Sequence, residues 1–208
     1  MRPSRHSWSK RRRLGTALLA AGLLLLSVVG PAHAWTRENN NYYDPSPGSS
    51  QSCNPCLRTF KTAGGNKYWT TGTWHSGWNT YLDSAYRVWN DGADTRPDMP
   101  VFIRGAAMSG PWKWGVGNLG AGLCGYVAFS YSSGFITAAV YNLDSGTAYD
   151  VGWPPASGHC FLQWTLAHEI GHTESIGHSQ FSSALMWHSQ WCATRPKGDE
   201  SAALDAIY

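Results

Sequence analysis

Residues 168–178 read HEIGHTESIGH, and this stretch decides both the expected fold and the expected chemistry. Apolar residues in and before the stretch recur at helical spacing, at Leu162, Leu166 and Ile170. This period predicts a helix over residues 161–174. On such a helix His168 and His172 are four residues apart, so their imidazoles project from one face and could hold one metal ion. Glu169 lies beside them, where its carboxylate could act on water and leave the metal to the histidines.

The third histidine of the stretch needs a change of chain direction to join the other two. On a straight helix His178 would lie about 9 Å along the axis from His172, too far to share a metal ion. The chain must therefore turn back after Glu174. Three neutral nitrogen donors with an open fourth position are typical of a catalytic zinc site, whereas a closed, cysteine-rich set is typical of a structural one. The alternative is a set of surface histidines on an amphipathic helix.

The spacing of these residues resembles the zinc signature of the metzincin metallopeptidases, H-E-x-x-H-x-x-G-x-x-H, and especially of their matrixin-like branch. The resemblance implies an α+β fold, in which a twisted mixed sheet carries the active-site helix and a smaller C-terminal lobe follows the third histidine. It implies that His168, His172 and His178 bind one catalytic zinc ion and that Glu169 is the general base of a secreted zinc metalloendopeptidase. A protein or peptide substrate would pair with an edge strand, for which residues 135–143 are the candidate. A calcium requirement is left open.

Two further residues enter through the same resemblance. Members of the family follow the signature with a turn that holds a methionine beneath the metal, and Met186 fits that position, although a methionine in an apolar loop also packs without any such role. His188 occupies a position that holds tyrosine or proline in related families. Its imidazole could donate to the developing oxyanion or act as a fifth ligand, or it could be a loop histidine beside Trp187. Trp187 could itself line a substrate pocket or simply pack.

The chain departs from the family pattern at Ser175, where the signature has glycine. A chain that leaves the helix sharply at this point would adopt a positive φ, which costs a residue other than glycine roughly 1–2 kcal/mol. Gly177 could instead take up part of the turn. If Ser175 does hold that conformation, Ser175→Gly is expected to raise the melting temperature without harming activity.

The first 34 residues have the composition of a bacterial secretory signal peptide. Six basic residues and no acidic one precede an apolar run over residues 14–30, and the Ala32-His33-Ala34 stretch is typical of a cleavage site. The alternative is an uncleaved membrane anchor, for which the apolar run is short. Removal of residues 1–34 leaves ten basic against thirteen acidic residues, a net charge of −3, which argues against a nucleic-acid partner.

All five cysteines lie after the predicted cleavage site, in a part of the chain where oxidation is expected. They are Cys53, Cys56, Cys124, Cys160 and Cys192. Two disulfides and one remaining thiol are predicted, and the pairing is open. Residues 53–56 read CNPC, which could indicate zinc or redox chemistry, but the chain has no second such motif and no thioredoxin-like context. An ordinary disulfide framework is therefore favoured.

The remaining sequence indicates one domain after an irregular arm. Residues 35–66 are rich in Asn, Ser, Pro and Gly and predict the arm, and residues 67–208 predict a metallopeptidase catalytic domain that is monomeric and has no membrane contact after signal cleavage. Strands are predicted at residues 67–74, 99–104, 126–131 and 135–143. A helix capped by Ser76 is predicted to end at Asp91-Gly92, loops at 105–122 and 144–160, and a closing helix at 199–208.

Twelve tryptophans permit a second function of a different class, a Trp-rich extracellular module that binds a polymer or carbohydrate and has a structural or vestigial zinc site. Trp112 and Trp114, in the predicted glycine-rich loop, are the candidates for such a surface, although burial in the core is favoured for them. An intact Glu169 argues against this function, because binding zinc does not require that carboxylate.

Overall fold

The predicted strands and helices occur in the predicted order, together with strands that the sequence does not predict. The computed structural model describes residues 58–106, 110–120, 122–179, 181–189 and 193–208. The predicted signal peptide and most of the predicted arm lie outside these residues. The strands are β1 (Arg58–Thr59), β2 (Asn66–Thr70), β3 (Phe102–Arg104), β4 (Trp112–Gly117), β5 (Gly125–Ser132), β6 (Phe135–Asp144), β7 (Tyr149–Asp150) and β8 (Cys160–Phe161). The α-helices are α1 (Asn79–Asn90), α2 (Leu162–Thr173) and α3 (Gly198–Ile207).

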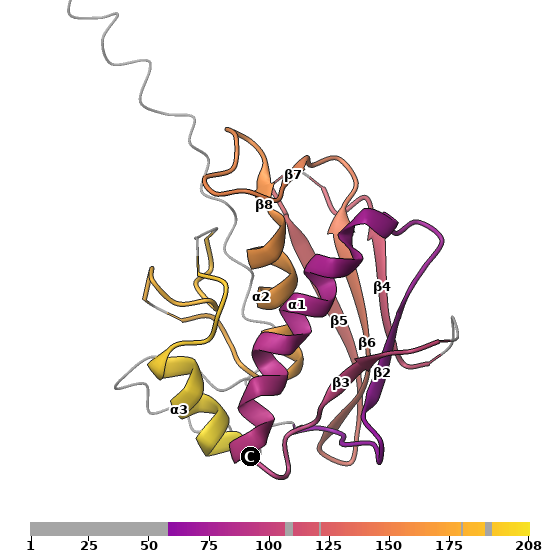
Figure 1. Ribbon diagram of the computed structural model, residues 1–208, viewed down its shortest axis with the longest axis vertical. Helices are drawn as coiled ribbons and strands as arrows, with labels where there is room; N and C mark the ends of the chain where they lie inside the picture. Colours follow the sequence, from indigo (N-terminus) through magenta and orange to yellow (C-terminus); the bar gives the residue numbers. More distant parts are fainter. Residues whose placement is uncertain (1–57, 107–109, 121, 180, 190–192) are drawn as a thin grey trace, which may run out of the picture. The chain divides into compact units, whose positions relative to one another are not determined.

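The main sheet is mixed and mostly parallel, as Figure 1 shows. Its strand order is β3-β2-β4-β6-β5. The short strand β1 lies on the same side of β6 as β4, and it pairs with the first residues of β6 whereas β4 pairs with the later ones. Every pairing is parallel except that of β5 with β6, which form an antiparallel hairpin. Ser133 and Gly134 have φ values of 52° and 82° and form its turn, which the sequence predicts. A separate pair, β7 and β8, lies in the segment predicted as a loop.

The candidate edge strand was wrongly placed at residues 135–143. Those residues form β6, which has β5 on one side and β4 and β1 on the other. The strand at this edge of the sheet is β5. The two strands of a hairpin show a similar alternation of apolar residues. The sequence therefore predicts that the two strands pair with each other, but it does not indicate which of them pairs with another strand on its other side.

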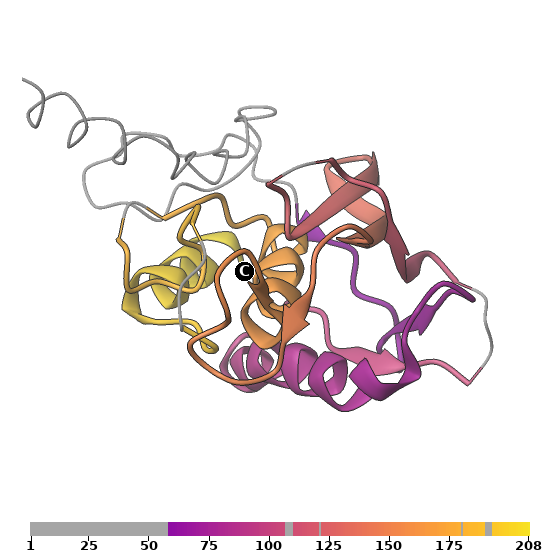
Figure 2. The ribbon, with the colours of Figure 1, turned by 90° about the horizontal axis from the view of Figure 1, so that it is seen from above.

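Only one face of the sheet is covered by helices within the described residues. On β4, Trp112 and Trp114 are 2% and 0% exposed, whereas Lys113 between them points to the other face. Figures 1 and 2 show α1 and α2 packed against each other on the covered face, with α3 on their far side from the sheet. This is a two-layer α+β arrangement with its core between the sheet and the helices.

Aromatic side chains from α1 and the sheet fill this core. Tyr86 of α1 stacks on Tyr68 of β2 and Phe102 of β3, and its hydroxyl accepts a hydrogen bond from Trp114 Nε1 at 2.9 Å. One turn further along α1, Trp89 is fully buried and donates its Nε1 hydrogen to the carbonyl oxygen of Ala167 on α2, at 2.8 Å. The bond fixes the position of α1 against the helix that carries the histidines.

The segment predicted as a loop at residues 105–122 contains the central strand β4. Its sequence, WKWGVG, alternates large apolar residues with others and pairs with β2 on one side and β6 on the other. Glycines usually weaken strands, which is why the segment resembles a loop. The burial of Trp112 and Trp114 confirms the favoured interpretation that they belong to the core.

Two predicted helix boundaries also differ from the structure. Ser76 does not cap α1, because residues Ser76–Trp78 form a short 3₁₀ turn and the helix begins after it without a side-chain cap. The helix ends at Asn90, but Asp91–Thr95 continue as a second 3₁₀ turn instead of stopping the chain. The closing helix α3 matches its prediction within one residue.

Only part of the cysteine prediction falls on the described residues. Cys124 and Cys160 form a disulfide, whereas Cys53, Cys56 and Cys192 lie outside the described residues. Among the described residues, no helix has the length and apolar character needed to cross a membrane. Residues 58–66, which the sequence assigns to the arm, contribute β1 and the start of β2 to the sheet.

Candidate metal centre

The helix α2 brings the first two histidines into the interior. All its residues except Gln163 are buried, and His168 and His172 are 1% and 9% exposed. Their rings lie one helical turn apart with centroids separated by 4.8 Å. Both the helix and the common face of the two histidines are therefore as predicted.

A Schellman turn ends α2 and returns the chain toward these histidines. The Ile176 amide donates to the carbonyl oxygen of Gly171 at 3.2 Å, and the Ser175 amide donates to that of His172 at 3.0 Å. These are the two hydrogen bonds of the motif, which places its C′ residue in the left-handed region. That residue is Ser175, with φ of 65°. The positive φ expected for Ser175 is confirmed.

The turn brings His178 to the other two histidines. Its ring centroid lies 5.2 Å from that of His168 and 4.9 Å from that of His172. One nitrogen from each of the three rings lies within 4.8 Å of the others, and the group could hold a metal ion. It is the only such cluster of His, Cys, Asp or Glu in the part of the chain that the structure describes.

Backbone carbonyls determine which nitrogen of two of the rings can bind a metal. Nδ1 of His168 lies 2.9 Å from the carbonyl oxygen of Leu185, and Nδ1 of His172 lies 2.9 Å from that of Ile176. A carbonyl can only accept, so each Nδ1 carries the hydrogen and each neutral ring keeps its lone pair on Nε2. Nε2 of His168 is buried and has no hydrogen-bond partner among the described residues. A metal ion would satisfy it.

The three rings are held in the neutral form that metal binding requires. Burial lowers the pKa of His172 to about 4. Burial also lowers the pKa of His168 and of His178, and in each case the neighbouring imidazoles lower it further. Three uncharged nitrogen donors are therefore present at neutral pH.

Glu169 is buried beside the cluster. It is 1% exposed, and its Oε2 atom has no hydrogen-bond partner among the described residues. Burial raises the pKa of this carboxyl group to about 8. A buried titratable group whose pKa is displaced toward neutrality, next to a possible metal site, is a candidate for proton transfer.

The loop with Met186 lies against α2, on the side of Gly171. Met186 is fully buried, and a Cβ atom added to Gly171 would lie 2.3 Å from its sulfur atom. The loop is held from both sides: Trp164 Nε1 donates to the carbonyl oxygen of Leu185 at 3.0 Å, and the Met186 amide donates to Glu200 Oε1 at 2.8 Å. His188, further along the loop, is half-buried, and its ring packs on that of Trp187 at 3.9 Å.

Several residues that shape the centre were not predicted from the sequence. The carbonyl of Leu185 has no sequence signal, since every residue has one. Glu200 is a fully buried carboxylate of α3, and its role depends on a contact across the fold. Gly171 could have been noticed, because a glycine inside a predicted helix usually marks a close packing contact.

Neither a protein-family model nor a curated protein matches this sequence. The function therefore has to be argued from the chemistry of the residues themselves.

The conformation of Ser175 leads to a prediction on stability. At φ of 65° a residue with a Cβ atom is strained by roughly 1–2 kcal/mol. Comparing Ser175→Gly with Ser175→Ala isolates this strain, because both variants lose the hydroxyl group and only alanine keeps Cβ. We expect the glycine variant to unfold at the higher temperature in a thermal melt. Equal melting temperatures would show that the strain is no larger than the stability that glycine loses through its greater freedom in the unfolded chain.

Proposed function

We propose that this chain is a secreted zinc-dependent endopeptidase of the metzincin type, with His168, His172 and His178 as zinc ligands and Glu169 as the general base. The observation that carries the proposal is the meeting of three neutral imidazoles beside a buried carboxylate. Histidine-only sites that lack a fourth protein ligand are typical of catalytic zinc, and structural sites are usually closed by cysteines. Met186, buried under the same helix, supports the site in this proposal.

The proposed chemistry divides between the metal and the chain. When bound, zinc supplies Lewis acidity that polarises a peptide carbonyl and lowers the pKa of water. Glu169 accepts the proton that water loses during attack and passes it to the departing amine. Burial raises the pKa of this group to about 8, and a nearby cation favours its charged form, so the two influences oppose each other. A carboxyl group can act first as a base and then as an acid when its pKa lies near the working pH.

The edge strand β5 is the proposed binding strand for an extended peptide. Among the described residues β5 pairs only with β6, on one of its sides, and its first residue, Gly125, lies against Glu169. A peptide that pairs with the other side of β5 would pass directly beside this carboxylate. Main-chain pairing of this kind binds many sequences alike and leaves preference to side-chain pockets.

The alternative function is a Trp-rich polymer-binding module, and the two tryptophans that were its best candidates for a binding surface are not exposed. Trp112 and Trp114 are buried between the sheet and α1, where no polymer can stack on them. Trp74 and Trp89 are also buried. Five of the nine described tryptophans belong to the core, including both candidates for the surface, and we do not propose this function.

The proposed activity is tested with casein and a library of quenched peptides. We expect the purified chain to hydrolyse peptide bonds, to lose this activity on treatment with a chelator, and to regain it when zinc is added back. Hydrolysis that survives complete removal of the metal would contradict the role of the histidines. A zinc-loaded chain that cleaves no member of the library would contradict the proposal as a whole.

His188 leads to a prediction on the rate. It lies close enough to His168 and His178 to lower the pKa of both, so its imidazole is placed near the proposed reaction. We expect His188→Phe, which keeps a ring to pack on Trp187, to lower kcat/KM about tenfold, or about 1.4 kcal/mol. Zinc content should not change. An unaltered kcat/KM would identify His188 as a packing residue only.

A further inference from the structure

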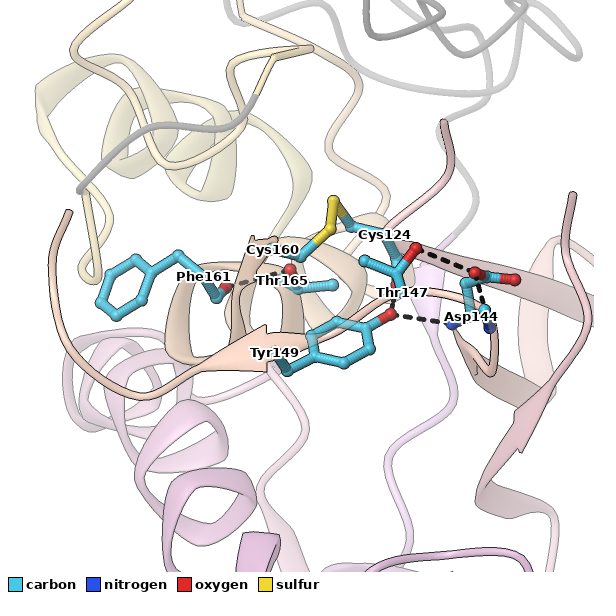
Figure 3. Close-up of a disulfide and its surroundings, with 8 residues drawn as sticks. Cys124, Asp144, Thr147, Tyr149, Cys160, Phe161 and Thr165 are labelled. Atoms are coloured by element: carbon cyan, nitrogen blue, oxygen red, sulfur yellow. Dashed lines mark hydrogen bonds between the residues drawn. A yellow bond between two sulfur atoms is a disulfide. The ribbon is translucent and has the colours of Figure 1, made fainter. Parts of the chain in front are cut away.

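The disulfide joins the start of the edge strand to the start of the histidine-bearing helix. Cys124 immediately precedes β5, and Cys160 is the first residue of β8, which leads directly into α2. Their Cα atoms lie 5.8 Å apart, although 36 positions separate them in the sequence. Figure 3 shows the bond above the first turn of α2, next to Thr165 and Phe161. The crosslink therefore holds together two elements that also pack against each other.

The residue after Cys124 makes the closest approach of β5 to α2. A Cβ atom added to Gly125 would lie 2.9 Å from Oε1 of Glu169, 3.0 Å from its Cγ, and 2.9 Å from Cγ2 of Thr165. Real Cβ atoms essentially never come so close to other atoms. Only glycine allows the strand to lie directly on these two side chains, which are four residues apart and share one face of the helix.

On the helix side of this contact, Thr165 is fixed by a hydrogen bond and by burial. Thr165 is fully buried, and its hydroxyl donates to the carbonyl oxygen of Phe161 at 3.0 Å. Phe161 is covalently next to Cys160. The disulfide is thus linked to Glu169 along two short routes, through Gly125 on the strand and through Thr165 on the helix. Gly125 thus lies against both Thr165 and the Glu169 side chain.

We propose that the Cys124–Cys160 disulfide and Gly125 are a positioning device for the Glu169 carboxylate. The disulfide holds the first residue of β5 against α2, and the missing side chain of Gly125 lets the strand backbone confine Glu169 in one orientation. This inference rests on the proposed function, in which that carboxylate moves the proton. Gly125 also begins the proposed substrate strand, which it serves through its backbone; in this positioning role its missing side chain and the two cysteines act only through Glu169.

The first test is Gly125→Ala, measured with saturating zinc in the full chain. We expect kcat to fall at least tenfold, because the new methyl group displaces the Glu169 carboxylate, while KM and zinc affinity change less than about twofold. Thr165→Ser removes Cγ2 but keeps the hydroxyl, so in the double variant it should restore part of kcat. Gly117→Ala is the matched control, since a Cβ atom on this strand glycine meets only an ordinary contact at 3.8 Å.

The second test uses no activity. We expect Gly125→Ala to lower the melting temperature by about 5 °C in the wild-type background and clearly less in a Glu169→Ala background, where Oε1 and Cγ are gone. Equal losses in both backgrounds, together with an unchanged kcat in Gly125→Ala, would overturn the inference. A parallel fall of kcat and zinc affinity would also overturn it, because it would indicate general loosening of the centre.

The disulfide itself is tested with the double variant Cys124→Ala, Cys160→Ala. We expect it to bind zinc with near-normal affinity and to lose kcat as Gly125→Ala does. If this variant fails to fold, the Gly125 and Thr165 variants still decide the matter. A wild-type chain that hydrolyses no peptide but shows the difference between the two melting experiments would refute the proposed function and leave the confinement of Glu169 standing.

Discussion

The Glu169→Gln variant is expected to keep its full zinc content, and its rate of peptide hydrolysis is expected to fall at least a hundredfold. The two side chains have the same shape, so the buried space beside His168 remains filled. An amide cannot accept the proton that water loses during attack. General base catalysis typically contributes between about a hundredfold and ten-thousandfold in rate, or about 3–5 kcal/mol. Metal content by atomic emission and turnover of a quenched peptide should be measured on the same preparation.

Glu174→Gln is the matched control for this variant. Glu174 ends the same helix, is fully buried, and has a pKa raised by burial to about 8, as Glu169 has. Its Oε2 accepts a hydrogen bond from the Tyr208 hydroxyl at 2.8 Å and takes no part in the proposed chemistry. We expect turnover within about threefold of the wild type. Loss of zinc from Glu169→Gln, or near-normal turnover, would contradict the role assigned to Glu169.

The parts of the centre that depend on local spacing could be predicted from the sequence. His168 and His172 share a face because they are four residues apart on a helix, and this holds wherever the helix packs. The turn after Glu174 follows from the length of a straight helix, which would carry His178 too far away. The positive φ at Ser175 was expected from the resemblance, because the family signature has glycine at this position. Each inference needs only residues within about ten positions of one another.

The parts that depend on partners distant in the sequence could not be predicted. The placement of β5 at the edge is a property of strand order, and no pattern within β5 or β6 encodes it. The central strand β4 was missed because its burial comes from neighbours on both sides, which outweigh the low strand propensity of its glycines. The carbonyl oxygen that orients His168 comes from Leu185 across the loop.

Gly171 is explained only when its position in the sequence is combined with its contacts to distant residues. Glycine inside a helix costs roughly 1 kcal/mol relative to alanine, so its presence in the middle of α2 calls for a reason outside the helix. The structure supplies it, because a Cβ atom there would lie 2.3 Å from the sulfur of Met186 and 2.6 Å from Cζ2 of Trp89. The methionine is flexible, but the indole is fixed by its hydrogen bond to Ala167. The glycine thus lets both α1 and the Met186 loop lie against the helix beside His172.

Gly171→Ala is therefore expected to lower the free energy of unfolding by about 3 kcal/mol, despite the better helix propensity of alanine. Its effect should extend to the metal, because displacing the Met186 loop also moves the Leu185 carbonyl that orients His168. We expect zinc affinity to fall at least tenfold, as measured by competition with a chromogenic chelator, alongside chemical denaturation of the zinc-free chain.

Gly198→Ala provides the matched control, since Gly198 also lies in a helix but an added Cβ atom would have nothing within 4 Å. Alanine should leave zinc affinity unchanged there and stabilise the chain by up to about 1 kcal/mol, because only the helix propensity differs. If Gly171→Ala were as stable as Gly198→Ala, the packing of Trp89 and Met186 on α2 would not be what retains the glycine. If Gly171→Ala lost stability but bound zinc normally, the Met186 loop would be shown to adjust without disturbing His168.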